Sequence, residues 1–262
     1  MRKGKFWRSQ EKFSIVPKVD GSFAWSGQTM EFIPSGLSFS TRYTFFVASG
    51  VKGSLGREST NGYAATFTTR SPVTKLDVPS YLQKYALSCE VAGLRMVLAY
   101  RGVEVSEDEL LTGVGYDPTA NSGSLWGNPY VGFVGNVRGK QMVNGYGVYW
   151  EPIARAANRY RYAVSFEKWN LTKLTSSIEK GFPVITWVYV KNGKPTNWHT
   201  QTGDRIYAVP GEHVVVAVGF LGPPSRPSHI IVNDPLVGQA YWERDIFERK
   251  WDAFGRSGVL VY

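Results

Sequence analysis

The chain has 262 residues, of which 43% are hydrophobic and 19% charged, a composition typical of a folded protein rather than a disordered one. No apolar run reaches the roughly 18 residues of a membrane-spanning helix. The charged start "MRKGKFWRSQEKF" is not followed by an apolar segment, so we expect no signal peptide in this sequence. A single cysteine excludes an internal disulfide framework and a cysteine-based zinc site.

The net charge of +9 is unevenly distributed along the chain. Residues 1–75 hold 11 lysines and arginines against 4 acidic residues, a net +7, whereas residues 76–262 hold 19 against 17, a net +2. Any attraction to an anionic surface, such as bacterial cell-wall material, is therefore expected from residues 1–75. A solvated face together with a basic tail is the alternative. Net charge alone does not indicate a nucleic-acid partner.

Residues 13–70 contain short strand-like runs separated by Gly, Ser and Asn turns, a pattern that predicts an all-β sandwich. The runs are "FSIVPKV", "TMEFIPS", "RYTFFVAS" and "YAATFTT". The stretch "LSFSTRYTFFVASGVKGSLGRESTNGYAATFTT" resembles the second half of a bacterial Ig-like domain. We therefore expect a partial Ig-like β-sandwich over residues 1–70, followed by a linker over residues 71–75.

From Leu76 onward, helical patterns precede apolar strands, an order that favours an α+β domain over residues 76–262. A capping box of Ser106 and Glu109 marks the start of the second helix. Residues 113–147 are rich in Gly and Asn and are expected to form a long loop. The expected helices are 88–101, 106–112, 151–160 and 171–180, and the expected strands are 183–190, 213–221, 229–234 and 258–262.

The only cysteine lies where the first of these helices should begin. Ser88 is a good N-cap, which would make Cys89 the first helical residue. The partial positive charge at a helix N-terminus stabilises a thiolate, so we expect a thiol pKa below the free value of about 8.5. Gln83 precedes Cys89 by six residues, and its amide N–H groups could bind an oxyanion together with the Cys89 backbone N–H.

A nucleophilic cysteine requires a base, and the chain offers three histidines. His213 begins the apolar run "HVVVAVGF", His199 is expected in a surface loop, and His229 could cap the strand "HIIVND". His213 follows Cys89 by 124 residues, close to the separation of about 130–150 in papain-type enzymes. Asp234 ends the next strand and could orient the His213 ring.

The segments around these residues resemble the C39-like peptidase family, a papain-fold family of bacterial cysteine peptidases of which many are extracellular. The resemblance covers residues 76–262 in one order. It is carried by "LDVPSYLQ", "SCEVAGLRMVLAYRGVEVSEDEL", "WGNPYVGFVG", "GYGVYWEPI", "GFPVITWV", "GEHVVVAVGF" and "IIVNDP". It implies Gln83 for the oxyanion hole, Cys89 as nucleophile, His213 as base and Asp234 as the residue that orients it. The chain lacks the phosphate-binding loop G-x-x-x-x-G-K-[ST] of exporter-fused relatives.

We therefore expect a papain-like cysteine peptidase that cleaves peptide or amide bonds through a Cys89 thioester, with no cofactor or metal, outside a bacterial cell or on its surface. An acyltransferase that uses the same thioester and a non-catalytic surface-binding protein are the alternatives. Several aromatic side chains could line a substrate cleft or pack the long loop. They are Trp126, Tyr130, Phe133, Tyr146 and Tyr149.

Overall fold

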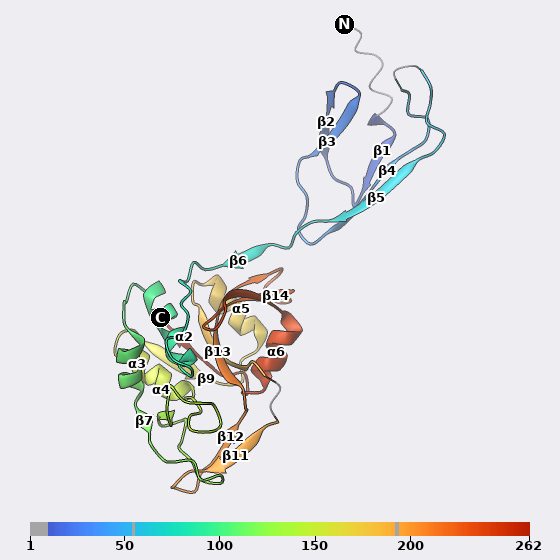
Figure 1. Cartoon of the computed structure of the whole chain (residues 1–262). Helices are drawn as coiled ribbons and strands as arrows, with labels where there is room; N and C mark the ends of the chain where they lie inside the picture. The colour runs from blue at the N-terminus through green and yellow to red at the C-terminus, as the bar shows by residue number, and fades with distance from the viewer. Residues whose placement is uncertain (1–9, 54–55, 192–193) are drawn as a thin grey trace. The chain divides into compact units, whose positions relative to one another are not determined.

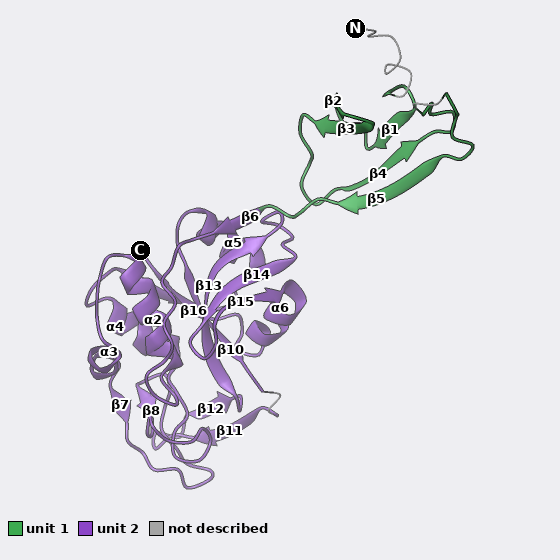
Figure 2. Cartoon of the chain, turned by 45° about the horizontal axis from the view of Figure 1, so that its top comes forward, with its two compact units in different colours: residues 1–72 green, residues 73–262 purple. Residues whose placement is uncertain are grey.

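A computed structural model describes residues 10–53, 56–191 and 194–262 and divides the chain into two compact units, residues 1–72 and 73–262 (Figure 2). Residues 1–9, which belong to the charged start of the chain, lie outside the described residues. Each unit is described separately below.

The first unit contains short antiparallel strands, as its turn-separated runs predict. One sheet has the order β1-β4-β5, and β2 pairs with β3 as a hairpin. The ring of Phe13 lies 4.7 Å from that of Phe32 and 6.2 Å from that of Phe45, so aromatic side chains form the centre of this unit. The strands are β1 (Phe13–Val16), β2 (Gly21–Ser26), β3 (Thr29–Pro34), β4 (Arg42–Val47) and β5 (Tyr63–Thr68).

The expected linker at residues 71–75 is wrong in its second half. Val73–Lys75 forms strand β6, which pairs antiparallel with β13 (Glu212–Leu221) of the second unit. The backbone N–H of Leu76 then donates to the Val218 carbonyl at 2.8 Å. The backbone groups of residues 73–76 are therefore satisfied by a neighbouring strand, which a linker composition does not reveal.

The second unit is built from helices packed on a seven-stranded antiparallel sheet. Its strands follow the order β15-β14-β13-β10-β16-β9, and β6 also pairs with β13. The strands after β6 are β9 (Ala163–Phe166), β10 (Val184–Tyr189), β13, β14 (His229–Asp234), β15 (Gly238–Glu243) and β16 (Gly258–Val261). The helices are α2 (Cys89–Tyr100), α3 (Glu107–Val114), α4 (Trp150–Ala157), α5 (Leu171–Glu179) and α6 (Arg244–Asp252).

Helices cover both faces of this sheet. Side chains alternate along strand β13, so neighbouring residues of the strand belong to different cores. Val214 and Val216 belong to the core shared with α2, α3 and α4, whereas Val215 and Ala217 belong to the core shared with α5 and α6. Figure 1 shows the two groups of helices on opposite sides of β13. This arrangement explains why the strand reads as a continuous apolar run rather than an alternating one.

Helix α2 lies close to β13 because it carries a glycine where the two elements meet. A Cβ atom at Gly93 would lie 3.1 Å from a methyl carbon of Val214 and 3.4 Å from one of Val216. The absence of a side chain at this position therefore brings the start of α2, with Cys89, close to the start of β13.

Residues 115–147 form a long connection with only short strands, so the expected loop of residues 113–147 begins two residues later, after the end of α3. Strand β7 (Tyr116–Asp117) pairs in parallel with β8 (Phe133–Val134). Outside this connection, β11 (Thr196–His199) pairs antiparallel with β12 (Arg205–Ala208). Trp126 and Phe133 are buried in the core, so they pack the connection rather than line an open cleft. Among the described residues, no helix is both long enough and apolar enough to cross a membrane.

Candidate active site

Cys89 is the first residue of α2 and is buried, as the sequence predicts for its position. The expected capping by Ser88 is wrong: its side chain makes no capping hydrogen bond to α2 and instead donates to Glu107 Oε2 at 2.7 Å. Glu107, the first residue of α3, also accepts the backbone N–H of Lys84 at 3.1 Å. A buried carboxylate therefore ties the turn before Cys89 to the neighbouring helix.

His213 and Asp234 form a buried pair at the ends of two paired strands. His213 follows the first residue of β13, and Asp234 is the last residue of β14. His213 Nε2 lies 2.7 Å from Asp234 Oδ1, and that oxygen also accepts the Leu236 backbone N–H at 2.8 Å. Because Nε2 is engaged by the carboxylate, Nδ1 is the ring nitrogen left for proton transfer.

Asn233, the other candidate to orient His213, serves a different segment. Its Nδ2 donates to the Val78 carbonyl at 3.0 Å, and its Oδ1 accepts from Gln239 Nε2 at 3.1 Å. Neighbouring residues of a strand point to opposite faces, so only one of the two reaches the imidazole. The structure places Asp234 there.

Gln83 lies beside Cys89, with its side-chain donors already engaged. Its backbone N–H donates to the Pro235 carbonyl at 2.9 Å. Its Nε2 donates to the carbonyls of Tyr85 at 2.8 Å and Ala86 at 2.9 Å. An oxyanion at this position would have to take one of these two N–H groups from its backbone acceptor.

One cavity of about 210 Å³ brings the predicted residues together. Gln83, Cys89 and His213 all line it, and Asp234 reaches it through His213. Its remaining lining residues are Ala86, Leu87, Gln141, Tyr146, Val190, Lys191, Gly211, Glu212 and Leu236. His199 lies in β11 and His229 begins β14, where its ring lies 3.1 Å from Ser228 Oγ, and neither lines this cavity.

The predicted lowering of the thiol pKa is wrong for this arrangement. Burial raises the pKa of Cys89 well above its ordinary value, and the nearby carboxyls of Glu90 and Glu212 raise it further. Burial likewise raises the pKa of Glu90 to about 7 and that of Glu212 well above its ordinary range. The partial charge of the helix N-terminus, worth up to about 2 kcal/mol in partly buried sites, is outweighed by desolvation and by the acidic neighbours.

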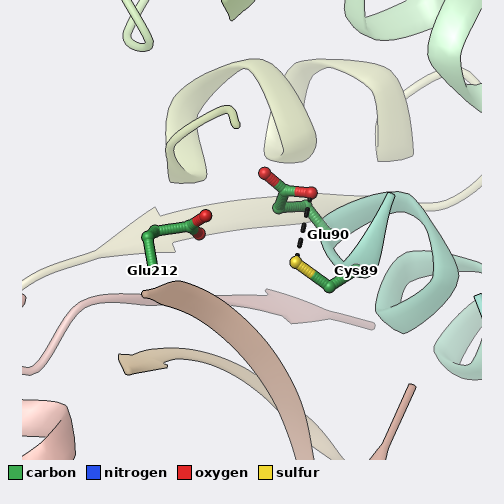
Figure 3. Close-up of side chains that lie close together, drawn as sticks. All are labelled: Cys89, Glu90 and Glu212. Atoms are coloured by element: carbon green, nitrogen blue, oxygen red, sulfur yellow. Dashed lines mark hydrogen bonds between the residues drawn. The ribbon is translucent and has the colours of Figure 1, made fainter. Parts of the chain in front are cut away.

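Glu90 and Glu212 are site residues that the sequence analysis missed. Figure 3 shows both carboxyls beside the sulfur of Cys89. Each directly adjoins a predicted residue, since Glu90 follows Cys89 and Glu212 precedes His213. The available signal was an acidic residue at the start of an apolar run. Whether such a side chain points into the protein or into solvent depends on the tertiary fold.

Comparison with known proteins finds similar sequences and structures in other bacteria. The chain is 31% identical over 183 residues to the uncharacterized protein YvpB of Bacillus subtilis (strain 168), covering 66% of this chain and 68% of that protein. The crystal structure of a candidate C39-like peptidase from Bacillus anthracis is 27% identical, with a TM-score of 0.64 over 73% of this chain and 98% of that one.

A more distant similarity is found with the peptidase domain of Streptococcus ComA, a bifunctional ABC transporter involved in quorum sensing. That domain is 18% identical, with a TM-score of 0.41, over 72% of this chain and 96% of that one. The family model described as the Peptidase_C39 like family matches residues 75–259, which include Gln83, Cys89, His213 and Asp234. The chain therefore belongs to the Peptidase_C39-like family.

Proposed function

We propose that the protein is a cysteine peptidase that hydrolyses peptide or amide bonds through a thioester on Cys89. The observation that carries this proposal is the common cavity, which is lined by the Cys89 helix start and by the His213 ring that is paired with Asp234. Membership of the family supports the same class of reaction.

In this mechanism, His213 Nδ1 takes the proton of the Cys89 thiol as the sulfur attacks the substrate carbonyl carbon. The tetrahedral oxyanion is bound by the Cys89 backbone N–H and by Gln83 Nε2, once substrate has displaced one of its backbone acceptors. As the C–N bond breaks, His213 returns the proton to the leaving amine. His213 Nδ1 then takes a proton from water as the water oxygen attacks the thioester carbon. The C–S bond breaks, the acid is released and His213 returns the proton to the Cys89 sulfur, while Asp234 holds the ring in place.

The experiment that tests the proposal is incubation of the full chain with a peptide library, followed by mass spectrometry. We expect cleaved peptides from the native protein and none from the Cys89→Ala and His213→Ala variants. His199→Ala is the matched control, because His199 does not line the cavity, and it should retain cleavage. Peptides joined to an added amine would instead identify an acyltransferase. Peptides left unchanged by every variant would favour a binding protein and contradict the proposal.

A further inference from the structure

A cluster of three buried groups places the nucleophile Cys89 beside two acidic residues, Glu90 and Glu212, that the mechanism above does not use. Cys89 Sγ, one carboxyl oxygen of Glu90 and one of Glu212 all lie within 4.8 Å of one another (Figure 3). The three residues are between 1% and 5% exposed. The nucleophile therefore sits against two acidic side chains rather than against apolar packing alone.

Glu90 is held by contacts to both of its carboxyl oxygens. The Cys89 thiol donates to Oε2 with an Sγ–O distance of 3.4 Å, and the Val148 backbone N–H donates to Oε1 at 2.7 Å. Because Glu90 lies in the first turn of α2 and Val148 precedes α4, these bonds fix the carboxyl between two elements. The thiol proton thus points at a carboxyl oxygen.

Glu212 approaches the same place from β13 with fewer contacts. Its Oε1 is buried and has no hydrogen-bond partner within the described part of the chain. A Cβ atom at Gly147 would lie 2.6 Å from Glu90 Oε1 and 2.7 Å from Glu212 Oε2, so the Gly147 backbone closes over both carboxyls. Gly147 also has a φ of +150°, where a side chain is strained.

No cation compensates these two acids. Neither Glu90 nor Glu212 forms an ion pair among residues 10–53, 56–191 and 194–262. Burying two unpaired carboxylates side by side is very costly, and proteins avoid this by keeping at least one proton on such a pair.

The other titratable groups around the cluster do not change this conclusion. The phenols of Tyr146 and Tyr149 lie 3.0 Å apart, and burial raises the pKa of each well above its ordinary value, so both are neutral. His213 is paired with Asp234, and Lys191 lines the outer part of the cavity as an exposed residue.

We propose that the Glu90 and Glu212 carboxyls together retain at least one proton beside Cys89 and act as positioning residues that keep its thiol protonated in the resting protein. The proposal rests on the proposed function only in taking Cys89 as the nucleophile. The thiol hydrogen bond to Glu90 orients the sulfur until the His213 ring takes the proton during the reaction.

The acid pair has a defined effect on the reactivity of the thiol. As pH rises through about 7, Glu90 loses its proton and the negative charge beside Sγ increases. That charge opposes ionisation of the thiol, so the pKa of Cys89 moves further up rather than down. Native Cys89 should therefore react more slowly with an alkylating reagent at neutral pH than an ordinary cysteine.

The first test is the pH profile of alkylation by iodoacetamide, which reports on one residue because the chain has one cysteine. Glu90→Gln and Glu212→Gln keep the side-chain shape, and Gln at 90 keeps an acceptor for Val148. We expect each to move the profile to lower pH by about one unit or more, which is roughly a tenfold faster reaction below the midpoint.

Glu151→Gln is the matched control for alkylation. Glu151 also has a buried oxygen without a partner among the described residues and a pKa raised by burial, yet it lies outside the cavity. This variant should leave the profile unchanged. The proposal would be overturned if the alkylation midpoint of the native protein lay at or below that of the denatured chain. It would also be overturned if the Glu90→Gln and Glu212→Gln variants kept the native midpoint.

The second test detects the retained proton through the infrared absorption of a protonated carboxyl group at pH 7. Because removal of either partner lets the other ionise more readily, the signal should fall in both Glu90→Gln and Glu212→Gln and persist in Glu151→Gln. Absence of the signal in the native protein would overturn the proposal, as would a metal ion found in the cluster by elemental analysis. Neither test needs a substrate, so each outcome is independent of whether peptides are cleaved.

Discussion

Two adjacent residues at the end of β14, Asn233 and Asp234, have separate roles that single substitutions should distinguish. Asp234→Ala removes the partner of His213 and should lower peptide turnover by at least about 100-fold, which is the lower end of the contribution of general acid–base catalysis. Asn233→Ala removes the bond to the Val78 carbonyl and should cost about 1–3 kcal/mol of stability, with little effect on turnover of the folded protein. Steady-state kinetics and thermal unfolding measure the two effects, and the reverse ranking would contradict the assignment.

The buried acids predict how stability depends on pH. The pKa of Glu90 rises from 4.5 to about 7 on folding, and that of Glu212 also rises, because burial disfavours their charged forms. The folded protein therefore binds these protons more tightly than the unfolded chain. Their contribution is present below pH 4.5 and is lost as pH rises through about 7.

Substitution of Glu212 should remove part of this dependence. Glu212→Gln cannot ionise, so the variant should unfold at a higher temperature than the native protein at pH 8 and at nearly the same temperature at pH 4. Thermal unfolding followed by circular dichroism at both pH values checks this, with Glu151→Gln as the control. An equal shift at both values would indicate a packing effect rather than ionisation.

How much of the site could be predicted differs from residue to residue. Cys89 and His213 stand at the starts of strongly apolar elements, and Asp234 precedes a proline, so their chain positions and the family resemblance pointed to them together. Glu90 and Glu212 were missed because an acidic residue at the start of a helix or strand usually points into solvent. Only the approach of α2 to β13 turns them toward each other, and that approach depends on Gly93, which offers no sequence pattern of its own.

At the scale of elements, predictability followed the length and continuity of the apolar pattern. The helix expected at 88–101 is observed at Cys89–Tyr100, and the strand expected at 213–221 at Glu212–Leu221. The helix expected at 151–160 is shorter, Trp150–Ala157. Helix α6 was missed because it buries only Phe247 and Trp251 among charged residues, and β9 because it has only four residues. Short elements of this kind form through tertiary packing rather than local pattern.

The start of α2 should depend on α3 through one hydrogen bond. Ser88 Oγ donates to the Glu107 carboxylate at 2.7 Å in a buried environment, which is worth about 1.5–3 kcal/mol for a charged acceptor. In a double-mutant cycle of Ser88→Ala and Glu107→Gln, we expect strong non-additivity in the free energy of unfolding. Additive effects would mean that the two residues act separately.

Ser106 provides the control for that cycle. Its side chain accepts the Glu109 backbone N–H at 3.2 Å as an ordinary cap of α3. Ser106→Ala should therefore cost about 1 kcal/mol and combine additively with Ser88→Ala, since the two residues share no partner. Urea unfolding measures both cycles. Equal coupling energies in the two cycles would mean that Ser88 has no specific interaction with Glu107 of α3.

At the scale of the whole molecule, the net charge of +7 in residues 1–75 predicts binding to anionic cell-wall material. Co-sedimentation of the full chain with purified cell walls should weaken as salt is raised, because exposed charges more than about 10 Å apart are screened at 0.1 M salt. Retention that is insensitive to salt would contradict this prediction. The Ig-like character of the first unit likewise stays a prediction.

The boundary between the two units gives the last prediction. The second unit has its own cores on both faces of its sheet, so a fragment of residues 73–262 should fold alone and keep any peptidase activity. A fragment of residues 76–262, the boundary that the sequence suggested, lacks β6. It loses the pairing of Val73, Thr74 and Lys75 with β13 and exposes part of the β13 edge.

We expect the shorter fragment to unfold at a temperature several degrees lower, since about 1 kcal/mol shifts the midpoint by roughly 2–4 °C in a domain of this size. It should also aggregate more readily, because an unpaired strand edge is open to other chains. Both fragments should show the same alkylation profile, as β6 pairs with the far end of β13 from Glu212. Equal stability of the two fragments would place β6 outside the cooperative unit and restore the linker assignment for residues 73–75.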